Sequence, residues 1–356
     1  MKDSQLSDGK IVRSSEPLNL EMPFEKLDGF ITPTELFYVR MHYPIPKIDW
    51  NKWRLRVEGE VEKPFELDYD ELTKLESKKV LAMLECAGNT RSALESKVAG
   101  VQWGLGAVGN ANWTGVPLSL LLDRAGVKQT AREVILEGAD EGPVAEPLAP
   151  RGNVRFARSV PLAKAREDVL LAYKINDVDL PAEHGFPVRA IVPGWYAVAS
   201  VKWLQRVIVI DRPFNGYYQA MDYAFWKSDG GNAELVPLRE MPIKAEIAQP
   251  INGETVSANS KVCVHGAAWA GEGEVTKVEL SVDGGATWSE TKLGESRPNA
   301  WRLWQFDWRT PPAAGKRTLI ARATDANGRT QPVKRDLDRG TYMINHLVPI
   351  TVEVKL

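Results

Sequence analysis

The sequence changes character near residue 243, and this change limits the possible folds more than any other feature of the chain. Beyond it the signals for helices disappear, and β-branched and aromatic runs return at close intervals. Asp283-Gly284-Gly285, between two of these runs, is typical of a hairpin turn because such residues accept positive φ. About seven short strands joined by turns predict an immunoglobulin-like β-sandwich over residues 241–356. We expect its strands within residues 261–271, 277–293, 300–308, 316–331 and 346–356.

Residues 1–240 combine short strands with little helix. Residues 114–126 predict a helix, because Pro117 stands near the start, three leucines fall on one face and Gly126 can end it. Three β-branched runs bounded by turn residues predict buried strands at residues 133–140, 188–194 and 200–213. The helix content is too small for a doubly wound sheet. We therefore expect an α+β protein whose first domain is mixed α/β.

Length and charge exclude several classes of protein. A chain of 356 residues predicts two domains, and a net charge of -2 provides no bulk attraction to nucleic acid or to an anionic membrane surface. No apolar run is long enough to span a bilayer. The first residues lack the apolar core of a signal peptide. We therefore expect a cytoplasmic protein as the sequence stands, or a periplasmic one if an export signal was removed.

Cys86 lies in the segment LECAGNTRS, and three roles are open to it. It can be a buried apolar thiol, a nucleophile that needs a base, or a metal ligand. The four histidines are scattered along the chain, and neither a C-x-x-C nor an H-x-x-x-H pattern is present. A metal bound by this one thiolate would therefore take its other ligands from a cofactor. Cys263 falls on a predicted sandwich strand, where we expect a core thiol.

Several segments resemble the sulfite oxidase family of molybdenum enzymes. LECAGNTRS is similar to the family's CAGN-x-R cysteine segment, and ELFYVRMHYPIPKID is similar to its ELFFVRNH segment. GVQWGLGAVGNANWTGVPL, HGFPVRAIVPG, SVKWL and a late RG pair follow in the family's order, and the resemblance runs from about residue 28 to the end of the chain. It implies a molybdopterin-binding catalytic domain of sulfite oxidase type over residues 1–240. An immunoglobulin-like dimerisation domain would follow over residues 241–356.

The resemblance also implies which residues hold the cofactor and the substrate. The Cys86 thiolate would bind molybdenum, and the pyranopterin dithiolene would supply two further sulfurs. Arg189 and Lys202 would neutralise the cofactor's phosphate, and Asp140 would accept hydrogen bonds from pterin N–H groups. The remaining cofactor-binding residues would be Tyr38, Val39, Arg40, Met41, His42, His184, Ser200 and Val201. The catalytic residues around a small oxyanion would be Arg40, Arg91, Trp103, Tyr223 and Arg339.

The activity implied by the resemblance is the oxidation of sulfite to sulfate by a homodimer, with molybdenum and molybdopterin as cofactor. The chain has no C-x-x-C-H haem motif, so the electrons would pass to an external acceptor, either a cytochrome or dioxygen. Two residues depart from the family pattern. Met41 replaces the commoner Asn, and Ala199 stands where animal members have an Arg. Two alternatives stay open: the same cofactor with nitrate or a sulfoxide as substrate, and a non-catalytic binding protein that has lost the cofactor.

Overall fold

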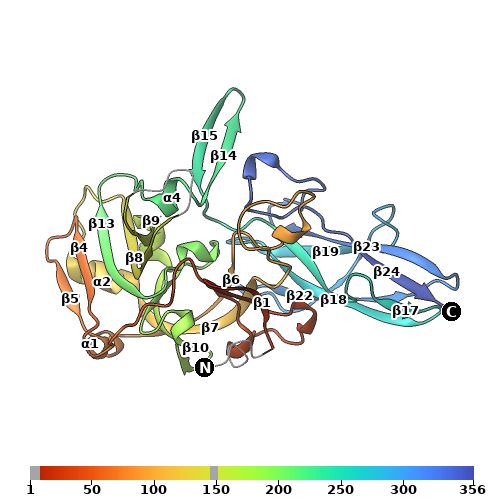
Figure 1. Cartoon of the computed structure of the whole chain (residues 1–356), viewed down its shortest axis with the longest axis horizontal. Helices are drawn as coiled ribbons and strands as arrows, with labels where there is room; N and C mark the ends of the chain where they lie inside the picture. The colour runs from red at the N-terminus through yellow and green to blue at the C-terminus, as the bar shows by residue number, and fades with distance from the viewer. Residues whose placement is uncertain (1–8, 145–150) are drawn as a thin grey trace.

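The computed structural model describes residues 9–144 and 151–356. The molecule is elongated, and the two parts of the sequence lie at opposite ends of its long axis (Figure 1). The first part holds several small sheets and all the α-helices of the described ranges, and the second holds two further sheets. The observed α+β architecture therefore follows the change in sequence near residue 243.

The first part is built on two five-stranded sheets. One has the order β5-β4-β13-β8-β9, in which β4 and β13 are parallel and the other neighbours are antiparallel. Its bounds are β4 Leu55–Gly59, β5 Phe65–Leu67, β8 Glu133–Gly142, β9 Val154–Pro161 and β13 Leu204–Ile210. The other has the order β11-β10-β7-β6, with β12 also paired to β10. Its bounds are β6 Lys78–Glu85, β7 Val108–Pro117, β10 Leu170–Ile175, β11 Val178–Asp179 and β12 Arg189–Ile191.

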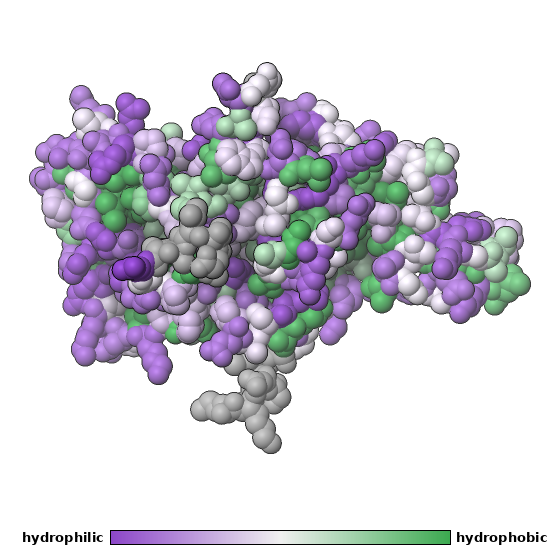
Figure 2. Space-filling model, turned by 45° about the horizontal axis from the view of Figure 1, so that its top comes forward, coloured by the Kyte–Doolittle hydropathy of each residue, from purple (hydrophilic) through white to green (hydrophobic). Residues whose placement is uncertain are grey.

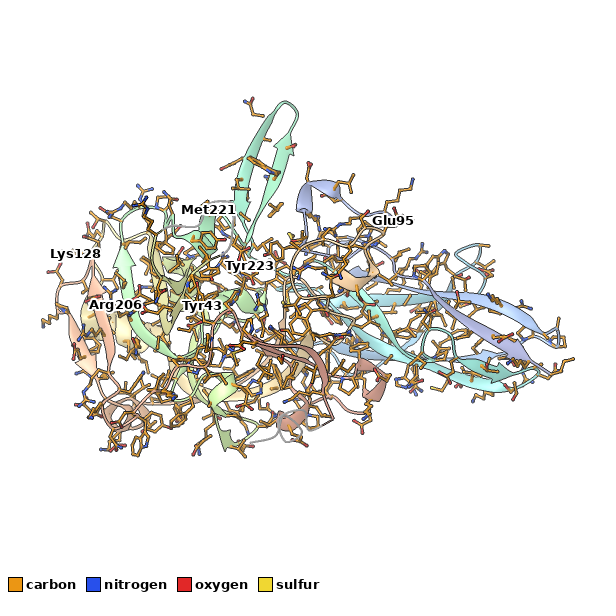
Figure 3. All side chains as sticks on the ribbon, viewed as in Figure 1. Tyr43, Glu95, Lys128, Arg206, Met221 and Tyr223 are labelled. Carbon is orange, nitrogen blue, oxygen red and sulfur yellow. The ribbon has the colours of Figure 1, made fainter. Side chains whose placement is uncertain are left out.

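Smaller elements complete the first part. Strands β1 (Ile11–Ser15), β2 (Leu18–Glu21) and β3 (Val39–Arg40) form a three-stranded sheet. A hairpin of β14 (Ala224–Asp229) and β15 (Asn232–Pro237) stands out from the body of the molecule, with Tyr223 at its base (Figure 3). Single 3-10 turns connect other strands at η2 Phe24–Lys26, η3 Thr34–Leu36, η4 Arg91–Ala93, η5 Ala182–His184 and η6 Ala197–Ala199, and a further one, η7 Leu337–Arg339, belongs to the second part.

Helix α2 (Leu118–Ala125) confirms the predicted helix, although it begins later than expected. Residues before Leu118 belong to β7 because they pair with β6 and β10. Leu121 and Leu122 are fully buried, and Gly126 ends the helix with φ 68°, a left-handed conformation that suits glycine. The other helices are short: α1 Tyr69–Thr73, α3 Leu162–Glu167 and α4 Tyr217–Ala220.

The second part consists of two sheets that enclose a common buried core. One has the order β16-β18-β22-β21 and the other β17-β24-β23-β19-β20. The enclosed apolar cluster takes Val264 and Trp304 from the first of these sheets and Val278, Ala321 and Val352 from the second. The bounds are β16 Lys244–Gln249, β17 Thr255–Ser257, β18 Lys261–Trp269, β19 Val275–Ser281, β20 Ser289–Glu290, β21 Lys292–Leu293, β22 Arg302–Arg309, β23 Gly315–Asp325 and β24 Ile350–Lys355.

The turn between β19 and β20 has the predicted glycine geometry. Gly284 has φ 76° and Gly285 has φ 96°, conformations that a side chain with a Cβ rarely adopts. Asp283 accepts hydrogen bonds from Ser281 and Thr287 and closes the turn. The DGG signal therefore marks the hairpin that the sequence predicts.

The prediction of a core thiol at Cys263 is wrong. Cys263 is exposed, whereas the next residue, Val264, is fully buried in the sandwich core. Successive side chains of a strand point to opposite faces, so Cys263 lies on the outer face of β18. The sequence places the strand correctly but leaves open which of its faces is buried.

The apolar core is continuous between the two parts of the chain. Ala267, Trp269 and Trp301 of the second part belong to the same buried cluster as Met83 of the first. Trp301 also donates to the main-chain oxygen of Phe30 at 2.9 Å. Outside this core, hydrophilic side chains cover most of the face in Figure 2, with apolar ones scattered among them. No helix in the described ranges is long and apolar enough to cross a lipid bilayer.

Helix α2 offers a matched pair of leucines that tests its packing. Leu121 is fully buried, while Leu120 beside it is 37% exposed. Truncating a buried leucine removes burial energy and leaves a cavity. We expect Leu121→Ala to lower the free energy of unfolding by about 3 kcal/mol, measured by urea denaturation, and Leu120→Ala to change it by less than about 1 kcal/mol. Equal losses in the two variants would contradict the orientation of α2.

Candidate active site

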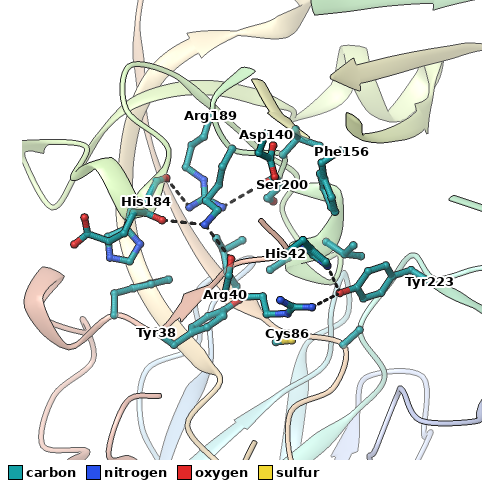
Figure 4. Close-up of a pocket in the computed structure, with 18 residues that line it drawn as sticks. Tyr38, Arg40, His42, Cys86, Asp140, Phe156, His184, Arg189, Ser200 and Tyr223 are labelled. Carbon is teal, nitrogen blue, oxygen red and sulfur yellow. Dashed lines mark hydrogen bonds between the residues drawn. The ribbon is translucent and has the colours of Figure 1, made fainter. Parts of the chain in front are cut away.

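A cavity in the first part of the chain brings together most of the residues predicted to bind the cofactor (Figure 4). It encloses about 660 Å³ of empty space, its open mouth included. Its walls come from the segments beside β3, β6, β8 and β12 and from the base of the β14–β15 hairpin. The predicted residues on its lining are Tyr38, Arg40, His42, Cys86, Asp140, His184, Arg189, Ser200, Val201, Lys202 and Tyr223.

Cys86 follows directly after β6 and is 7% exposed, with its thiol facing this cavity. The loop that follows is tightly bonded: the Cys86 N–H donates to Ala107 at 2.9 Å, and the Asn89 N–H donates to the Cys86 carbonyl at 2.8 Å. A Cβ on Gly88 would lie 2.3 Å from the guanidinium of Arg91. The spacing of C-A-G-N-x-R thus reflects packing, because the arginine folds back against the glycine.

Three basic side chains line the cavity: Arg189 is buried, and Arg40 and Lys202 are half-buried. The amine of Lys202 donates to the main-chain oxygens of Arg40 and Glu183, both at 2.9 Å. The guanidinium of Arg189 donates to the carbonyls of His184 and Ser200, both at 3.0 Å. Burial lowers the pKa of Arg189 to about 10, so it still carries its charge at neutral pH. Burial, and then the positive charge of Arg189, also lower the pKa of Lys202 well below its ordinary value.

Two buried polar atoms on the lining have no hydrogen-bond partner. They are Oδ1 of Asp140 and Nε2 of His184, in residues that are 5% and 2% exposed. Burial raises the pKa of Asp140 to about 6, although Lys202 opposes the shift. A buried polar atom without a partner costs free energy. The cavity therefore fits a ligand that carries anionic and hydrogen-bonding groups, as the phosphate and pterin of molybdopterin do.

Tyr223, His42 and Arg40 form a hydrogen-bonded group on another wall. The hydroxyl of Tyr223 lies 2.6 Å from Nε2 of His42 and 3.5 Å from the guanidinium of Arg40. Burial raises the pKa of Tyr223, so the phenol keeps its proton at neutral pH. Burial, Arg40 and Lys202 lower the pKa of His42 well below its usual range, so its ring is neutral. The hydrogen-bonded pair of Tyr223 and His42 can therefore relay a proton, whereas lasting uptake of a proton would place a disfavoured charge on His42.

The structure places three of the predicted catalytic residues behind the lining. Arg91 donates to the carbonyls of Thr341 and Val101, and its guanidinium lies 5.3 Å from the ring of Tyr342. Trp103 is fully buried and forms a T-shaped pair with Tyr38, with ring centroids 6.4 Å apart. Arg339, with 24% of its side chain exposed, pairs with Asp336 and Asn345, both at 3.1 Å. Their roles at the substrate stay predictions.

Val39 and Met41 also lie off the lining. Both are 1% exposed and belong to a separate apolar cluster with Leu20 and Trp203. Side chains alternate between the two sides of an extended chain. Because those of Tyr38, Arg40 and His42 face the cavity, those of Val39 and Met41 point away from it. The sulfur of Met41 nevertheless contacts the amine of Lys202 at 3.0 Å.

Sequence reasoning missed several residues of the cavity. Phe156 is on the lining and stacks on His42 at a ring distance of 4.7 Å, while Tyr342 lies off the lining and stacks on Tyr223 at 4.9 Å. Neither belongs to a motif that marks a site, so no sequence signal could have found them. The other unpredicted lining residues are Phe37, Leu84, Ala87, Glu183, Ala197 and Val198. In the described residues no group of three or more His, Cys, Asp or Glu side chains could hold a metal ion.

Comparisons with known proteins agree with this site. Residues 42–218 match the oxidoreductase molybdopterin binding domain, and residues 236–346 match the Mo-co oxidoreductase dimerisation domain. The fold and the site therefore define a two-domain molybdopterin-dependent oxidoreductase. Sulfite oxidase of Gallus gallus is 36% identical over 346 residues, which cover 91% of this chain and 73% of that protein. The chain belongs to the sulfite oxidase family.

The proteins similar to this chain include enzymes with different named activities. Mitochondrial sulfite oxidase of Rattus norvegicus is 36% identical over 90% of this chain, which spans 61% of that protein. An NADH nitrate reductase of Solanum lycopersicum is 33% identical over 89% of this chain and 38% of its own length. The crystal structure of the sulfane dehydrogenase SoxCD from Paracoccus pantotrophus matches with a TM-score of 0.81 and 28% identity, covering 96% of this chain and 88% of that one.

Asp140 provides a pH test of the cavity. Its pKa of about 6 lies above the ordinary 3.8, so the folded protein takes up this proton before the unfolded chain does as the pH falls. Asp140 therefore reduces stability as the pH rises from 3.8 to about 6, by at most about 3 kcal/mol. In cofactor-free protein, we expect Asp140→Asn to gain stability relative to the parent between pH 4.5 and 7. Parallel pH profiles of urea denaturation would contradict the raised pKa.

Proposed function

We propose that the chain catalyses the molybdenum-dependent oxidation of sulfite to sulfate and passes the electrons to an external acceptor. The observation that carries this proposal is the cavity in which the Cys86 thiol shares one space with Arg40, Arg189 and Lys202. Cys86 would bind the molybdenum, and Asp140, with its unpaired oxygen, would bind the pterin. When bound, the cofactor supplies the two-electron oxidation and the oxygen transfer.

The residues of the chain would act by binding anionic groups and relaying protons. Arg189, Lys202 and His184 would bind the phosphate and pterin, since two are cations and the third has an unpaired Nε2. Arg40 would orient the sulfite anion, because a guanidinium donates to two oxygens at fixed geometry. Sulfite and water give sulfate, two electrons and two protons. The neutral, hydrogen-bonded pair of Tyr223 and His42 is placed to relay one of these protons away from the substrate.

The second part of the chain would serve as the dimerisation domain, and the match of residues 236–346 supports this. We place the boundary at residue 240, ahead of β16 (Lys244–Gln249), where the first strand of the sandwich begins. Its two sheets with a common core agree with an immunoglobulin-like sandwich.

Reduction of nitrate is the second candidate, and Ala199 is the observation that favours it. Ala199 is 1% exposed and lies on η6, which ends beside the lining residue Ser200. An arginine at this position in animal sulfite oxidases would add a cation near the cavity. Its replacement by alanine changes the charge available to an oxyanion, and a nitrate reductase lies among the relatives.

Metal analysis and sulfite titration with ferricyanide as acceptor test the proposal. We expect about one molybdenum per chain and sulfite-dependent reduction in protein from a molybdenum-replete host, because one thiolate completes one site. Cys86→Ser should lose both properties. Cys263→Ser is the matched control, because Cys263 is exposed on the second part of the chain, and it should keep both.

The remaining outcomes separate the candidates. Molybdenum without sulfite turnover would contradict sulfite as the substrate. Nitrate would then be the next substrate to assay, with Ala199→Arg as the variant to compare. Protein that binds no molybdenum would contradict the cofactor site itself.

A further inference from the structure

The loop that carries Cys86 is closed by one buried lysine from the other part of the chain. Lys244, the first residue of β16, is 1% exposed. Its amine lies 3.1 Å from the carboxylate of Glu85 and donates to the hydroxyl of Thr90 at 2.7 Å. Glu85 immediately precedes Cys86, and Thr90 ends the C-A-G-N-T turn. One side chain therefore connects both ends of this loop.

The groups around Lys244 satisfy one another. A third contact of the amine goes to Glu246 at 3.2 Å, so each of its three N–H bonds has a partner. The carboxylate of Glu246 also accepts from Thr90 at 3.1 Å. Glu85 accepts from the indole of Trp269 at 2.9 Å and from the side chain of Asn89 at 3.2 Å. Glu85 and Glu246 raise the pKa of Lys244 against the effect of burial, so the amine stays charged.

Two more contacts hold the same loop from the same side. The Met343 N–H donates to the carbonyl of Ala87 at 2.9 Å, and Arg91 donates to the carbonyl of Thr341 at 3.1 Å. Thr90 is fully buried with φ 71°, a left-handed conformation that is costly for a β-branched residue. Such a conformation persists where its surroundings fix it, and here Lys244 and Glu246 both bond its hydroxyl.

We propose that Lys244 is a positioning residue that fixes the Cys86 loop so that the thiol faces the cavity. By this contact, the second part of the chain completes the metal site of its own protomer, which is a role beyond dimerisation. The functional consequence rests on the proposed role of Cys86 as the molybdenum ligand. The restraint of the thiol by Lys244 is independent of whether Cys86 binds molybdenum.

Lys164 provides a matched control. It is also buried, at 8% exposure, and also spans the two parts, since its amine lies 2.9 Å from Asp168 and 2.7 Å from Glu272. Asp168 follows α3 directly and Glu272 lies between β18 and β19, so both partners are apart from the Cys86 loop. Lys164→Met and Lys244→Met each remove a buried lysine that bridges the two parts, and only the second touches the loop. The carboxylates paired with Lys164 are more exposed, at 28% and 46% against 2% and 4% for those paired with Lys244.

The first readout is the rate at which iodoacetamide alkylates Cys86 in full-length, cofactor-free protein carrying Cys263→Ser. We expect Lys244→Met to raise this rate at least tenfold and Lys164→Met to leave it within twofold of the parent. The second readout is molybdenum per chain and the Mo(V) paramagnetic resonance signal of the loaded protein. Lys244→Met should lower the molybdenum content and alter the Mo(V) signal, while Lys164→Met should preserve both.

A second variant without charges at this cluster tests the proposal if Lys244→Met does not fold. Glu85→Gln, Lys244→Met and Glu246→Gln together remove the three charges of this cluster and keep similar side-chain volumes. This variant should fold and still show rapid alkylation. An unchanged alkylation rate in a folded Lys244 variant would overturn the proposal. If the rate rises but the parent binds no molybdenum, the restraint on the thiol stands and the proposed function fails.

Discussion

The cavity depends on one constraint: basic side chains are held away from water with fewer carboxylates than cations beside them. Arg40, Arg189 and Lys202 line one space, and the carboxylates on its lining are Asp140 and Glu183. Burial penalises each charge, which is why the pKa of Lys202 falls and the pKa of Asp140 rises. The protein accepts this cost where an anionic ligand can repay it. The charge balance of the lining alone therefore favours an anionic ligand, whichever anion it is.

Main-chain carbonyls keep these cations in place without neutralising them. Lys202 and Arg189 donate to carbonyl oxygens around the cavity, and Arg158, fully buried behind Tyr223, donates to the carbonyl of Leu238 at 2.6 Å. A carbonyl satisfies a donor but carries no net charge, so most of the positive potential remains for the ligand. A carboxylate in the same place would fix the side chain equally well and cancel its charge. Carbonyl partners therefore orient the basic side chains without neutralising their charge.

The sequence predicted the elements that depend on local signals. Gly126 ends α2, and Gly284 shapes the β19–β20 turn, because each signal acts on its own neighbourhood. The resemblance placed Cys86, His184 and Lys202 at one site, and the cavity contains all three. The buried face of β18 was beyond reach, because alternation along a strand fixes two faces without saying which is inside. Lys244 was missed because its partner Glu85 lies 159 positions away, and no local pattern records such a pairing.

This separation along the sequence has a consequence for how the site forms. The Cys86 loop sits between Glu85 and Thr90, and both bond a lysine that arrives only with β16. A contact across so many residues forms late, because the intervening chain must first be ordered. Until then the hydroxyl of Thr90 lacks both of its partners, because Lys244 and Glu246 both lie on β16. The loop can take its final shape only when the second part of the chain packs against the first, so the two parts form one cooperative site.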